Sequence, residues 1–351
     1  MAKVLIYGSY GYTGNLIAQL AAKKGLDAIL AGRDAQKLAK QSAELGLPSS
    51  AFDLSETEKL DAALRSVDVV LHCAGPFGYT YKAMTDACLR TSTHYLDIGG
   101  GIPELEAVAA LDVDAKSAGI MLTPGAGFDV VPSDCLLNYT KEKLPDATQL
   151  RLFIRSVGGG FSRGTARSGI ENIERHGVIR KDGKLTQVPL AWKTPKVDFG
   201  HGPVKLTSIP WGDVATAYHS TGVPNIEAYM HFPAAAIRTM KMMPYLGWLL
   251  YNRPAKELLK ALIGLFPPGP SPEQNRNGFS LLIAEAENAK GELVRAKLRT
   301  PESYWFTAMT SIAIVERILA GDFKVGFQTP NMAYSSDFVL GFDGVEREDI
   351  A

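Results

Sequence analysis

The feature that most constrains the fold of this chain is a glycine-rich turn close to its N-terminus. The stretch GSYGYTG at residues 8–14 follows the apolar run Val4–Tyr7 and leads into a segment of helical period. Glycines spaced three apart between a strand and a helix are typical of a dinucleotide-binding loop. Gly8 would permit the tight turn, Gly11 would let backbone approach a pyrophosphate, and Gly14 would let the helix lie close to the sheet.

The start of that helix provides the second part of the predicted site. Backbone N–H groups near Tyr12 and Thr13 fall in the first helical turn, where the helix offers them no carbonyl partner and its dipole favours negative charge. Phosphates bind at such positions. The alternative is a tight turn without a ligand. The residues of the loop that we expect to contact the cofactor are Gly8, Tyr10, Gly11, Tyr12, Thr13 and Gly14.

Short apolar runs alternate with helical segments through the first third of the chain, which predicts a parallel sheet covered by helices. The expected strands are Val4–Tyr7, Ala28–Ala31, Val67–His72, His94–Ile98 and Ile120–Thr123. The expected helices are Thr13–Lys24, Ala35–Leu45, Thr57–Arg65, Tyr81–Arg90 and Glu104–Ser117. Right-handed crossovers in this order give a doubly wound sheet of the Rossmann type, which we assign to residues 1–125.

The alternation stops after Pro145, and longer strand-like segments follow. These segments are Thr148–Val157, Val204–Ser208, Ile226–Phe232, Phe279–Asn288 and Leu293–Thr300. They favour a second, α+β domain for substrate binding and dimerisation, built on a largely antiparallel sheet over residues 126–322. The fold class is therefore α/β, with an N-terminal Rossmann sheet followed by this α+β domain. The last segment, 323–351, is expected to return to the Rossmann domain.

The end of the second strand bears on the choice between NAD and NADP. An acidic residue there bonds the ribose 2′-OH of NAD, whereas a guanidinium can fork onto the 2′-phosphate of NADP. Arg33 comes first, and Asp34 is better placed to cap the next helix. We therefore expect NADP(H) rather than NAD, with Lys37 as a second phosphate contact. The alternative for Arg33 is a solvated surface cation.

Two further strand ends supply expected cofactor contacts. Asp53 follows a further short strand that we expect between the helices Ala35–Leu45 and Thr57–Arg65, and it is expected beside the adenine. The expected strand Val67–His72 runs into CAGPFG at residues 73–78, at the sheet edge where a nicotinamide ribose would lie. Because no cationic partner for Cys73 is evident, we interpret it as a small apolar residue rather than a nucleophile. The expected contacts in this turn are Cys73, Ala74, Gly75, Pro76 and Phe77.

Glycine-rich stretches also follow later strands, at residues 95–101 and 123–134. They could wall a hydride-transfer site, with Asp97, Asp129 and Asp134 facing it. The same three aspartates fit equally well as helix caps and turn formers, and both interpretations stay open. A third such stretch, residues 158–169, follows the first strand of the second domain and is expected to point back toward the site.

Composition narrows the classes of partner. Lys+Arg and Asp+Glu both number 37, so no overall field recruits nucleic acid, and we expect none as a partner. The three cysteines, Cys73, Cys88 and Cys135, are widely spaced and form no C-x-x-C pair, so no metal site is expected and a reducing cytoplasm fits best. No apolar signal segment follows Met1–Lys3.

The segment Met240–Phe266 is rich in Met, Leu and aromatic residues. Pro244 and Pro254 interrupt it, and no apolar run reaches the roughly 18 residues of a membrane span. We interpret the segment as an amphipathic pair of helices packed on the second sheet. The alternative is a peripheral membrane face or a channel for a lipid-like substrate, so membrane association of a cytoplasmic protein stays open.

The chain resembles the saccharopine dehydrogenase-like oxidoreductases, and among them the branch that includes trans-acting enoyl reductases. The blocks that carry the resemblance cover nearly the whole chain. They are GSYGYTG (8–14), AGR (31–33), CAGPFG (73–78), YLDIGG (95–100), PGAGFDVVPSD (124–134), RGTARS (163–168), PPGPSPEQNRNGF (267–279), YWFTAMTSIAIVERIL (304–319) and GFQTP (326–330). The chain departs from the family pattern in two places. One is the bulky pair Ser9–Tyr10 in the first loop, and the other is Arg163 in the second domain.

The resemblance implies a pyridine-nucleotide domain and hydride transfer to a C=N or activated C=C bond. Saccharopine itself is disfavoured, because its carboxylates would need several arginines and the second domain is instead apolar and aromatic. The tryptophans assigned to that domain are Trp192, Trp211, Trp248 and Trp305. The leading hypothesis is therefore an NADPH-dependent reductase of an apolar or lipid-like small molecule.

The catalytic residues stay open at this point. The candidates for a proton donor are Tyr79, Tyr81, Thr165, Ser168 and His176. The alternatives to an enzyme are a non-catalytic, NADP-binding sensor and a peripheral membrane or lipid-associated protein. The broad predicted sheet favours a homodimer.

Overall fold

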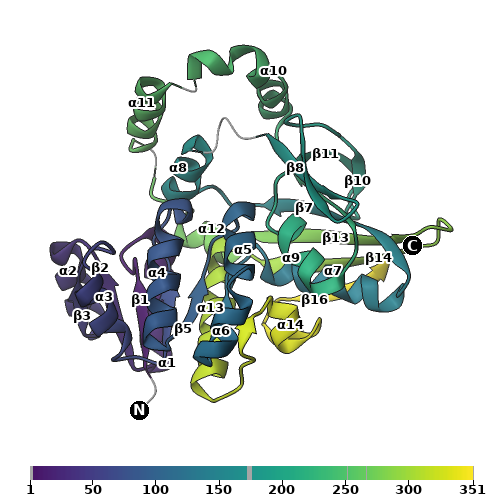
Figure 1. Ribbon diagram of the computed structural model, residues 1–351. Helices are drawn as coiled ribbons and strands as arrows, with labels where there is room; N and C mark the ends of the chain where they lie inside the picture. Colours follow the sequence, from purple (N-terminus) through teal and green to yellow (C-terminus); the bar gives the residue numbers. More distant parts are fainter. Residues whose placement is uncertain (1–2, 172–175, 251, 266, 351) are drawn as a thin grey trace. The chain divides into compact units, whose positions relative to one another are not determined.

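The computed structural model describes residues 3–171, 176–250, 252–265 and 267–350, and it divides the chain into two compact units. The first unit comprises Met1–Val131 and Tyr304–Ser335. The second comprises Pro132–Ser303 and Ser336–Ala351. Each unit is built around its own sheet (Figure 1).

The sheet of the first unit is parallel throughout, with the strand order β15-β6-β5-β4-β1-β2-β3. Its strands are β1 (Val4–Tyr7), β2 (Ala28–Gly32), β3 (Ser49–Ala51), β4 (Val69–His72), β5 (His94–Asp97), β6 (Met121–Thr123) and β15 (Gly326–Phe327). In the centre, Ile6 of β1 pairs with Leu30 on one side and Leu71 on the other. All three side chains are fully buried, as expected for a parallel sheet that is covered on both faces.

Helices cover this sheet, and glycines end several of them. The helices are α1 (Tyr12–Lys24), α2 (Ala35–Leu45), α3 (Thr57–Leu64), α4 (Phe77–Thr91), α5 (Ile102–Ala109), α6 (Asp112–Ala118), α13 (Ser303–Leu319) and α14 (Pro330–Tyr334). Helix α1 contacts α2, while α4 contacts α3, α5 and α6. Gly25 and Gly46 follow α1 and α2 with φ of +70° and +68°, the left-handed conformation in which glycine ends a helix without strain.

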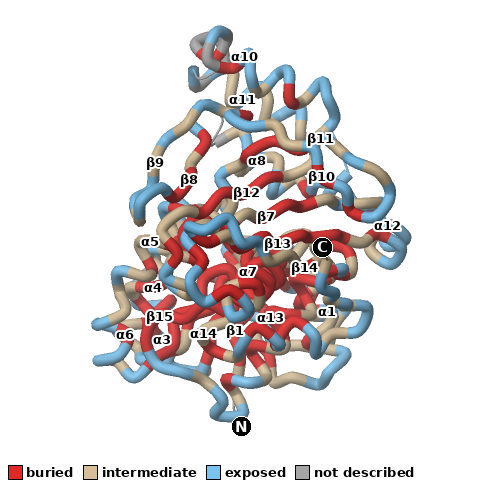
Figure 2. Tube along the Cα trace, turned by 90° about the vertical axis from the view of Figure 1, so that its right-hand side faces the viewer, coloured by how far each residue is buried: buried red, intermediate tan, exposed pale blue. Residues whose placement is uncertain are grey.

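The sheet of the second unit is mixed, with the strand order β10-β11-β12-β7-β13-β14-β16 and a β8–β9 hairpin attached to β12. Its strands are β7 (Ala147–Val157), β8 (Gly177–Lys181), β9 (Lys184–Val188), β10 (Lys196–Asp198), β11 (Pro203–Ile209), β12 (Asn225–His231), β13 (Phe279–Asn288), β14 (Leu293–Pro301) and β16 (Glu346–Ile350). Only β12 and β7 pair in parallel among the described strands of this sheet. Most residues of β13 are buried, and Figure 2 shows most of that strand in red.

The helices of the second unit are α7 (Val131–Lys143), α8 (Arg163–Glu171), α9 (Asp213–Thr221), α10 (Ala234–Leu250), α11 (Arg253–Ile263), α12 (Pro272–Asn277) and the 3₁₀ turn η1 (Phe338–Gly341). The helix pair α10–α11 corresponds to the predicted amphipathic pair. Helix α10 continues through Pro244, where a break was expected, whereas Pro254 lies in the first turn of α11, where its missing N–H needs no partner. Within the described ranges, every helix is too short or too polar to cross a membrane.

The α/β fold class is confirmed, with a parallel Rossmann-type sheet and a second, mixed α+β unit. The domain boundaries differ from those expected at residues 125 and 322. Helix α13, which we expected in the second domain, belongs to the first unit. Its residues contact that unit directly, since Lys24 Nζ lies 2.8 Å from Glu316 and Thr307 Oγ1 accepts the Phe128 N–H at 2.9 Å.

The C-terminal segment also divides between the two units. Strand β15 joins the first sheet beside β6, as expected for a returning segment, but β16 pairs with β14 in the second sheet. The sequence of β16, EREDI, is charged and lacks an apolar alternation, so it shows no strand pattern. Lys297 of β14 forms an ion pair with Glu348 of β16, and such cross-strand charge pairing stabilises a polar edge strand.

Candidate cofactor site

The order of the first sheet identifies where a ligand can bind. The chain moves from β1 outward to β2 and β3, and then returns past β1 to β4 and β5. Ligands of such sheets bind beyond the carboxyl ends of the two strands between which the order reverses. In this unit those strands are β1 and β4, and they are followed by the glycine-rich loop and the CAGPFG turn.

Gly8 and Gly14 of the first loop allow the tight turn and the close approach of α1 that the sequence predicts. Gly8 has φ of +84°, and a Cβ there would lie 2.8 Å from the backbone nitrogen of Ala74. A Cβ on Gly14 would lie 2.3 Å from the carbonyl oxygen of Gly8. The Gly11 N–H donates to that same oxygen at 3.0 Å. The loop is therefore closed on itself and packed against the turn after β4, with no room for a side chain at Gly8 or Gly14.

The start of α1 has the character of an anion site. Gly11 is the N-cap residue of this 13-residue helix, and it has no side chain to bond the first amides. The N–H groups of Thr13 and Gly14 have no carbonyl partner within the helix. The first turn holds no acidic residue, so nothing there repels a phosphate.

A buried hydrogen-bond network that the sequence did not reveal anchors the loop. Ser9 Oγ donates to Gln41 Oε1 at 2.7 Å, and Gln41 Nε2 donates to the Ser9 carbonyl at 2.9 Å. The same amide nitrogen lies 2.9 Å from Asn15 Oδ1. Ser9 and Gln41 are buried, so these bonds form in a medium that strengthens them. The bulkier Ser9 of this chain thereby ties the loop to α2.

Tyr10 extends from the same loop to the end of β2. Its hydroxyl oxygen accepts the Asp34 N–H at 3.2 Å. Its ring lies against Gly32, where a Cβ would be 2.6 Å from Cε1 of the ring. The structure thus brings together two stretches that the sequence singled out separately, the first loop and the AGR segment.

The residues after β2 are those from which the sequence predicts NADP rather than NAD. Arg33 is exposed, and within the described part of the chain its guanidinium makes no hydrogen bond or ion pair. Asp34 caps α2, as predicted, by accepting the Lys37 N–H at 3.1 Å. Lys37, the expected second phosphate contact, has its Nζ 3.1 Å from the Asp34 carboxylate, so the two side chains form an ion pair.

Asp53 lies just past β3, as the sequence predicts, and its carboxylate is already bonded. Its Oδ1 accepts both the backbone N–H and the hydroxyl of Ser55. These bonds lower the pKa of the Asp53 carboxyl, with a smaller contribution from the charge of Arg33. Ser55 therefore bonds backward to Asp53 and is not the N-cap of α3, a position that Glu56 occupies.

The CAGPFG turn connects β4 to α4, and Gly75–Pro76 is a cis peptide. Cys73 is partly exposed, and burial raises the pKa of its thiol. A neutral thiol agrees with the prediction that Cys73 is not a nucleophile. The ring of Phe77 packs against Gly99, where a Cβ would lie 2.9 Å from ring atom Cγ.

His72, at the end of β4, is a buried residue of this edge that the sequence analysis did not single out. Its Nε2 lies 2.9 Å from Thr80 Oγ1, and Thr80 Oγ1 donates to the Ala74 carbonyl at 2.8 Å. Because the Thr80 hydrogen is used there, we assign the His72 hydrogen to Nε2. Burial lowers the pKa of His72 to about 3, so the imidazole is neutral and braces the turn.

Asp97 joins two of the later glycine-rich loops. One carboxylate oxygen accepts the Gly99 N–H at 2.8 Å and the Gly125 N–H at 3.0 Å, and the other accepts the Tyr95 hydroxyl at 2.5 Å. Burial raises the pKa of Asp97 to about 6, although all three hydrogen bonds act to lower it. Asp97 therefore stabilises turns. This is one of the two roles that the sequence left open for it, the other being a residue that faces the site.

The other two aspartates differ in position. Asp134 is in the second unit, where its carboxylate accepts hydrogen bonds from Asn138 and Ser220. Asp129 packs against the loop after β5, since a Cβ on Gly100 would lie 1.8 Å from Asp129 Oδ2. The Asp129 carboxylate thus lies beside a predicted wall of the site, as the Asp97 carboxylate does.

The candidates for a proton donor divide between the units. Tyr79 and Tyr81 are on α4 of the first unit, and the Tyr79 side chain is 74% exposed. Thr165 and Ser168 are on α8 of the second unit, where the Thr165 hydroxyl lies 3.1 Å from Ser162 Oγ. His176 is an exposed residue just before β8. The geometry within each unit selects none of them.

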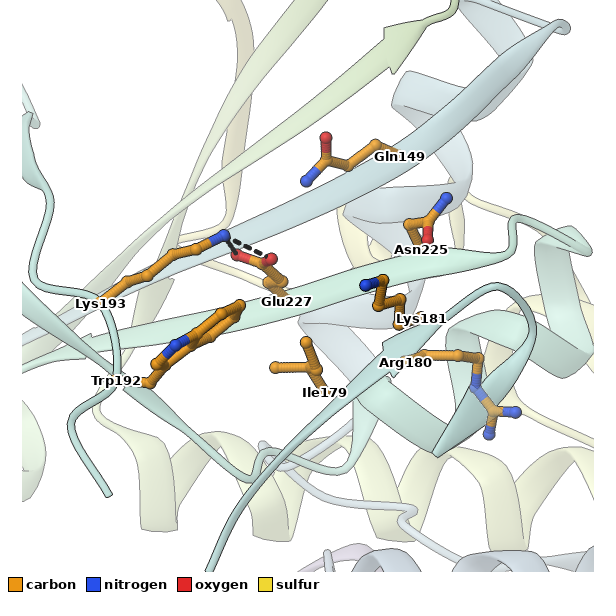
Figure 3. Close-up of a pocket in the computed structure, with 8 residues that line it drawn as sticks. All are labelled: Gln149, Ile179, Arg180, Lys181, Trp192, Lys193, Asn225 and Glu227. Carbon is orange, nitrogen blue, oxygen red and sulfur yellow. Dashed lines mark hydrogen bonds and ion pairs between the residues drawn. The ribbon is translucent and has the colours of Figure 1, made fainter. Parts of the chain in front are cut away.

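The second unit holds a small cavity beside β7, β8 and β12 (Figure 3). Trp192 and Ile179 line it, and Lys193 Nζ forms an ion pair with Glu227 at 2.7 and 3.0 Å. Its volume of ≈ 250 Å³ is below the roughly 300 to 1,000 Å³ of sites for drug-sized ligands. We therefore assign no substrate to it. Trp305, expected in this unit, instead belongs to α13 of the first.

Comparison with known proteins gives consistent results. Residues 4–122 match the family model of the saccharopine dehydrogenase NADP binding domain. The human saccharopine dehydrogenase-like oxidoreductase is 27% identical over 216 residues, which cover 53% of this chain and 50% of that protein. A Mycobacterium tuberculosis protein named as a trans-acting enoyl reductase is 30% identical over 181 residues, covering 48% of this chain and 43% of that protein. The chain thus spans about half the length of the curated relatives it matches.

A solved structure is similar over the whole chain. The apo saccharopine dehydrogenase (L-Glu forming) of Saccharomyces cerevisiae superposes with a TM-score of 0.65, 14% identity and coverage of 100% of both chains. At this identity the likeness shows a shared fold. The family model supports NADP(H) as the cofactor, as the sequence predicts. Residues 4–122 are therefore similar to the NADP binding domain of saccharopine dehydrogenase.

Proposed function

We propose that the chain is an NADP(H)-dependent oxidoreductase that reduces a C=C (enoyl) or C=N bond of an apolar small molecule. The observation that carries this proposal is the pairing of an uncapped helix start with an exposed guanidinium. The first supplies backbone donors for a pyrophosphate, and Arg33 at the end of β2 supplies a cation for a 2′-phosphate.

The residues present fit this cofactor. The glycine loop holds its shape through contacts that a Cβ at Gly8 or Gly14 would disrupt, as expected where backbone must approach a ligand closely. The expected cofactor contacts in the loop and at the β4 turn belong to one edge of one sheet. When bound, the nicotinamide would supply the hydride. The chain's part is then to orient the cofactor and the substrate and to exclude water.

The proposed substrate class rests on the relatives and on the chemistry of the site. The M. tuberculosis relative is named as an enoyl reductase, which motivates an activated C=C bond as the acceptor. Burial keeps His72 neutral, so its imidazole adds no positive charge that would attract an acidic substrate. Turnover is tested by following NADPH absorbance with the purified chain and panels of enoyl, imine and keto substrates. Tight NADPH binding without oxidation on every panel would favour a sensor instead.

Removing the Arg33 guanidinium tests the cofactor preference. In Arg33→Ala we expect the affinity for NADPH to fall about tenfold or more, because a hydrogen bond to a charged group contributes about 1.5–3 kcal/mol. The affinity for NADH should stay unchanged. Isothermal titration calorimetry with both cofactors measures this. Lys40→Ala is the matched control, since Lys40 is an exposed cation on the adjacent helix α2. An unchanged preference for NADPH in Arg33→Ala would show that Arg33 is a solvated surface cation.

A second candidate function, association with a lipid surface, is supported by the exposed apolar residues of α10 and α11. Tyr245 is 80% exposed, and Leu258 and Leu262 of α11 are 63% and 46% exposed. Lys256 and Lys260 lie on the same helix as these leucines. Basic amphipathic helices of this kind bind anionic membrane interfaces.

Vesicle flotation tests this second candidate. We expect the chain to float with vesicles that contain phosphatidylserine, and Leu258→Ser with Leu265→Ser to reduce the floated fraction several-fold, since each buried apolar side chain contributes about 1.5–3 kcal/mol. Leu265, 82% exposed, follows α11 directly. Val113→Ser is the control, because Val113 is 72% exposed on α6 of the first unit. Equal flotation of all variants would remove α11 as the contact.

A further inference from the structure

Tyr10 occupies a distinctive position between the first loop and the end of β2. Its hydroxyl oxygen accepts the Asp34 N–H at 3.2 Å, on the far side of Arg33. Its ring contacts Gly32, on the near side of Arg33, so closely that a Cβ there would be 2.6 Å from Cε1. The Tyr10 side chain therefore contacts both residues that flank Arg33, Gly32 and Asp34.

The hydroxyl of Tyr10 still has a hydrogen to donate. A phenol can donate one hydrogen bond as well as accept, and the bond from Asp34 uses only its acceptor side. Across the described residues, the structure gives this hydroxyl no acceptor. Arg33, the residue between the two that hold Tyr10, has an exposed guanidinium that makes no hydrogen bond or ion pair within the described ranges, although its charge acts on Asp53. The Tyr10 hydroxyl and the Arg33 guanidinium are thus two donors that one acidic ligand group could use.

The carboxylate of Asp34 is already bonded within the protein, so it does not compete with a ligand for these donors. The Asp34 carboxylate accepts the Lys37 N–H at 3.1 Å and pairs with Lys37 Nζ at 3.1 Å. In an NAD-specific domain an acid near this point accepts the ribose 2′-OH. Here that acid is engaged with α2, and its partner Lys37 Nζ lies 5.5 Å from the centre of the Tyr10 ring.

We propose that Tyr10 is a specificity-determining residue whose hydroxyl donates a hydrogen bond to the 2′-phosphate of NADP(H), beside the guanidinium of Arg33. The inference rests on the proposed cofactor function and adds a residue from the loop that was expected to meet only the pyrophosphate. A donor selects phosphate over hydroxyl because a hydrogen bond to a charged acceptor is stronger than one to a neutral acceptor. Tyr10 thereby links the phosphate-binding loop to the choice of cofactor.

The test uses two probes that differ only in the 2′-phosphate, adenosine 2′,5′-bisphosphate and 5′-AMP. Binding of each to the full chain and to Tyr10→Phe is measured by calorimetry, with thermal melting to verify that the variant folds. We expect Tyr10→Phe to weaken binding of the bisphosphate about tenfold and to leave 5′-AMP within twofold. Tyr245→Phe, at an exposed tyrosine of the second unit, is the control and should change neither affinity.

Two results would overturn the inference. If Tyr10→Phe weakens both probes equally, Tyr10 only shapes the loop; if it changes neither, its hydroxyl does not meet the ligand. A failure of the underlying cofactor proposal looks different, because the unmodified chain would then bind the bisphosphate no more tightly than 5′-AMP.

Discussion

Gly14→Ala is expected to weaken NADPH binding about 100-fold. A Cβ at this position would lie 2.3 Å from the Gly8 carbonyl oxygen and 3.1 Å from the Ser9 Cα. The loop backbone must therefore move away from α1, and overpacking of this kind costs about 1–3 kcal/mol. In a helix interior alanine is otherwise preferred to glycine by about 1 kcal/mol. A loss of NADPH affinity can thus be attributed to the displaced loop. Calorimetric titration with NADPH measures that affinity.

Gly169→Ala provides the matched control. Gly169 is also a helical glycine, on α8 of the second unit, and a Cβ there would meet no atom within 4 Å. This variant should bind NADPH as the unmodified chain does and should be slightly more stable to heat. Unchanged NADPH affinity in Gly14→Ala would mean that the loop is a tight turn without a ligand, the alternative that the sequence left open.

The second large effect is expected at Asp97, where the Ala variant should lower the free energy of unfolding by about 3–6 kcal/mol. Asp97→Ala leaves the Gly99 and Gly125 N–H groups and the Tyr95 hydroxyl without their acceptor, and each buried unpaired group costs about 1–3 kcal/mol. Asp97→Asn should be far milder, because one amide oxygen can accept both backbone N–H groups. Thermal melting of both variants measures the difference, and equally small effects would contradict the bracing role.

The same residue predicts a pH dependence. Burial raises the pKa of Asp97 to about 6 in the folded chain, against about 4 for an unfolded aspartate. The folded state therefore binds this proton more tightly than the unfolded state does. The resulting contribution of Asp97 to the free energy of unfolding is present below about pH 4 and is lost as pH rises through 6. Relative to Asp97→Asn, the unmodified chain should lose up to about 3 kcal/mol between these pH values. A difference that stays constant with pH would contradict the raised pKa.

Local patterns were sufficient to predict most of the first unit. Strand β1 was predicted at its observed bounds, because VLIY is apolar throughout and is followed directly by Gly8. The function of Asp34 as a cap was also predictable, because the residue types on either side define the start of α2. These features depend on neighbours within one or two turns of the chain.

The features that were missed depend on residues distant in sequence. Ser9 bonds Gln41, 32 positions away, and no local pattern announces that pair. Helix α13 was assigned to the wrong unit, because its apolar face gives no indication of which core it packs against. For Tyr10, a bulky residue in a loop that commonly holds small ones was the available signal, and its contact with Gly32 became visible only in three dimensions.

The central claim is that the first unit binds NADP(H) through the loop after β1 and the residues after β2. Calorimetric titration of the unmodified full chain with NADPH and, separately, with NADH tests it most directly. The account predicts saturable binding of NADPH at least about tenfold tighter than that of NADH, as one charge-assisted contact to the 2′-phosphate requires. Equal affinity for the two cofactors, or no binding of either, would contradict it.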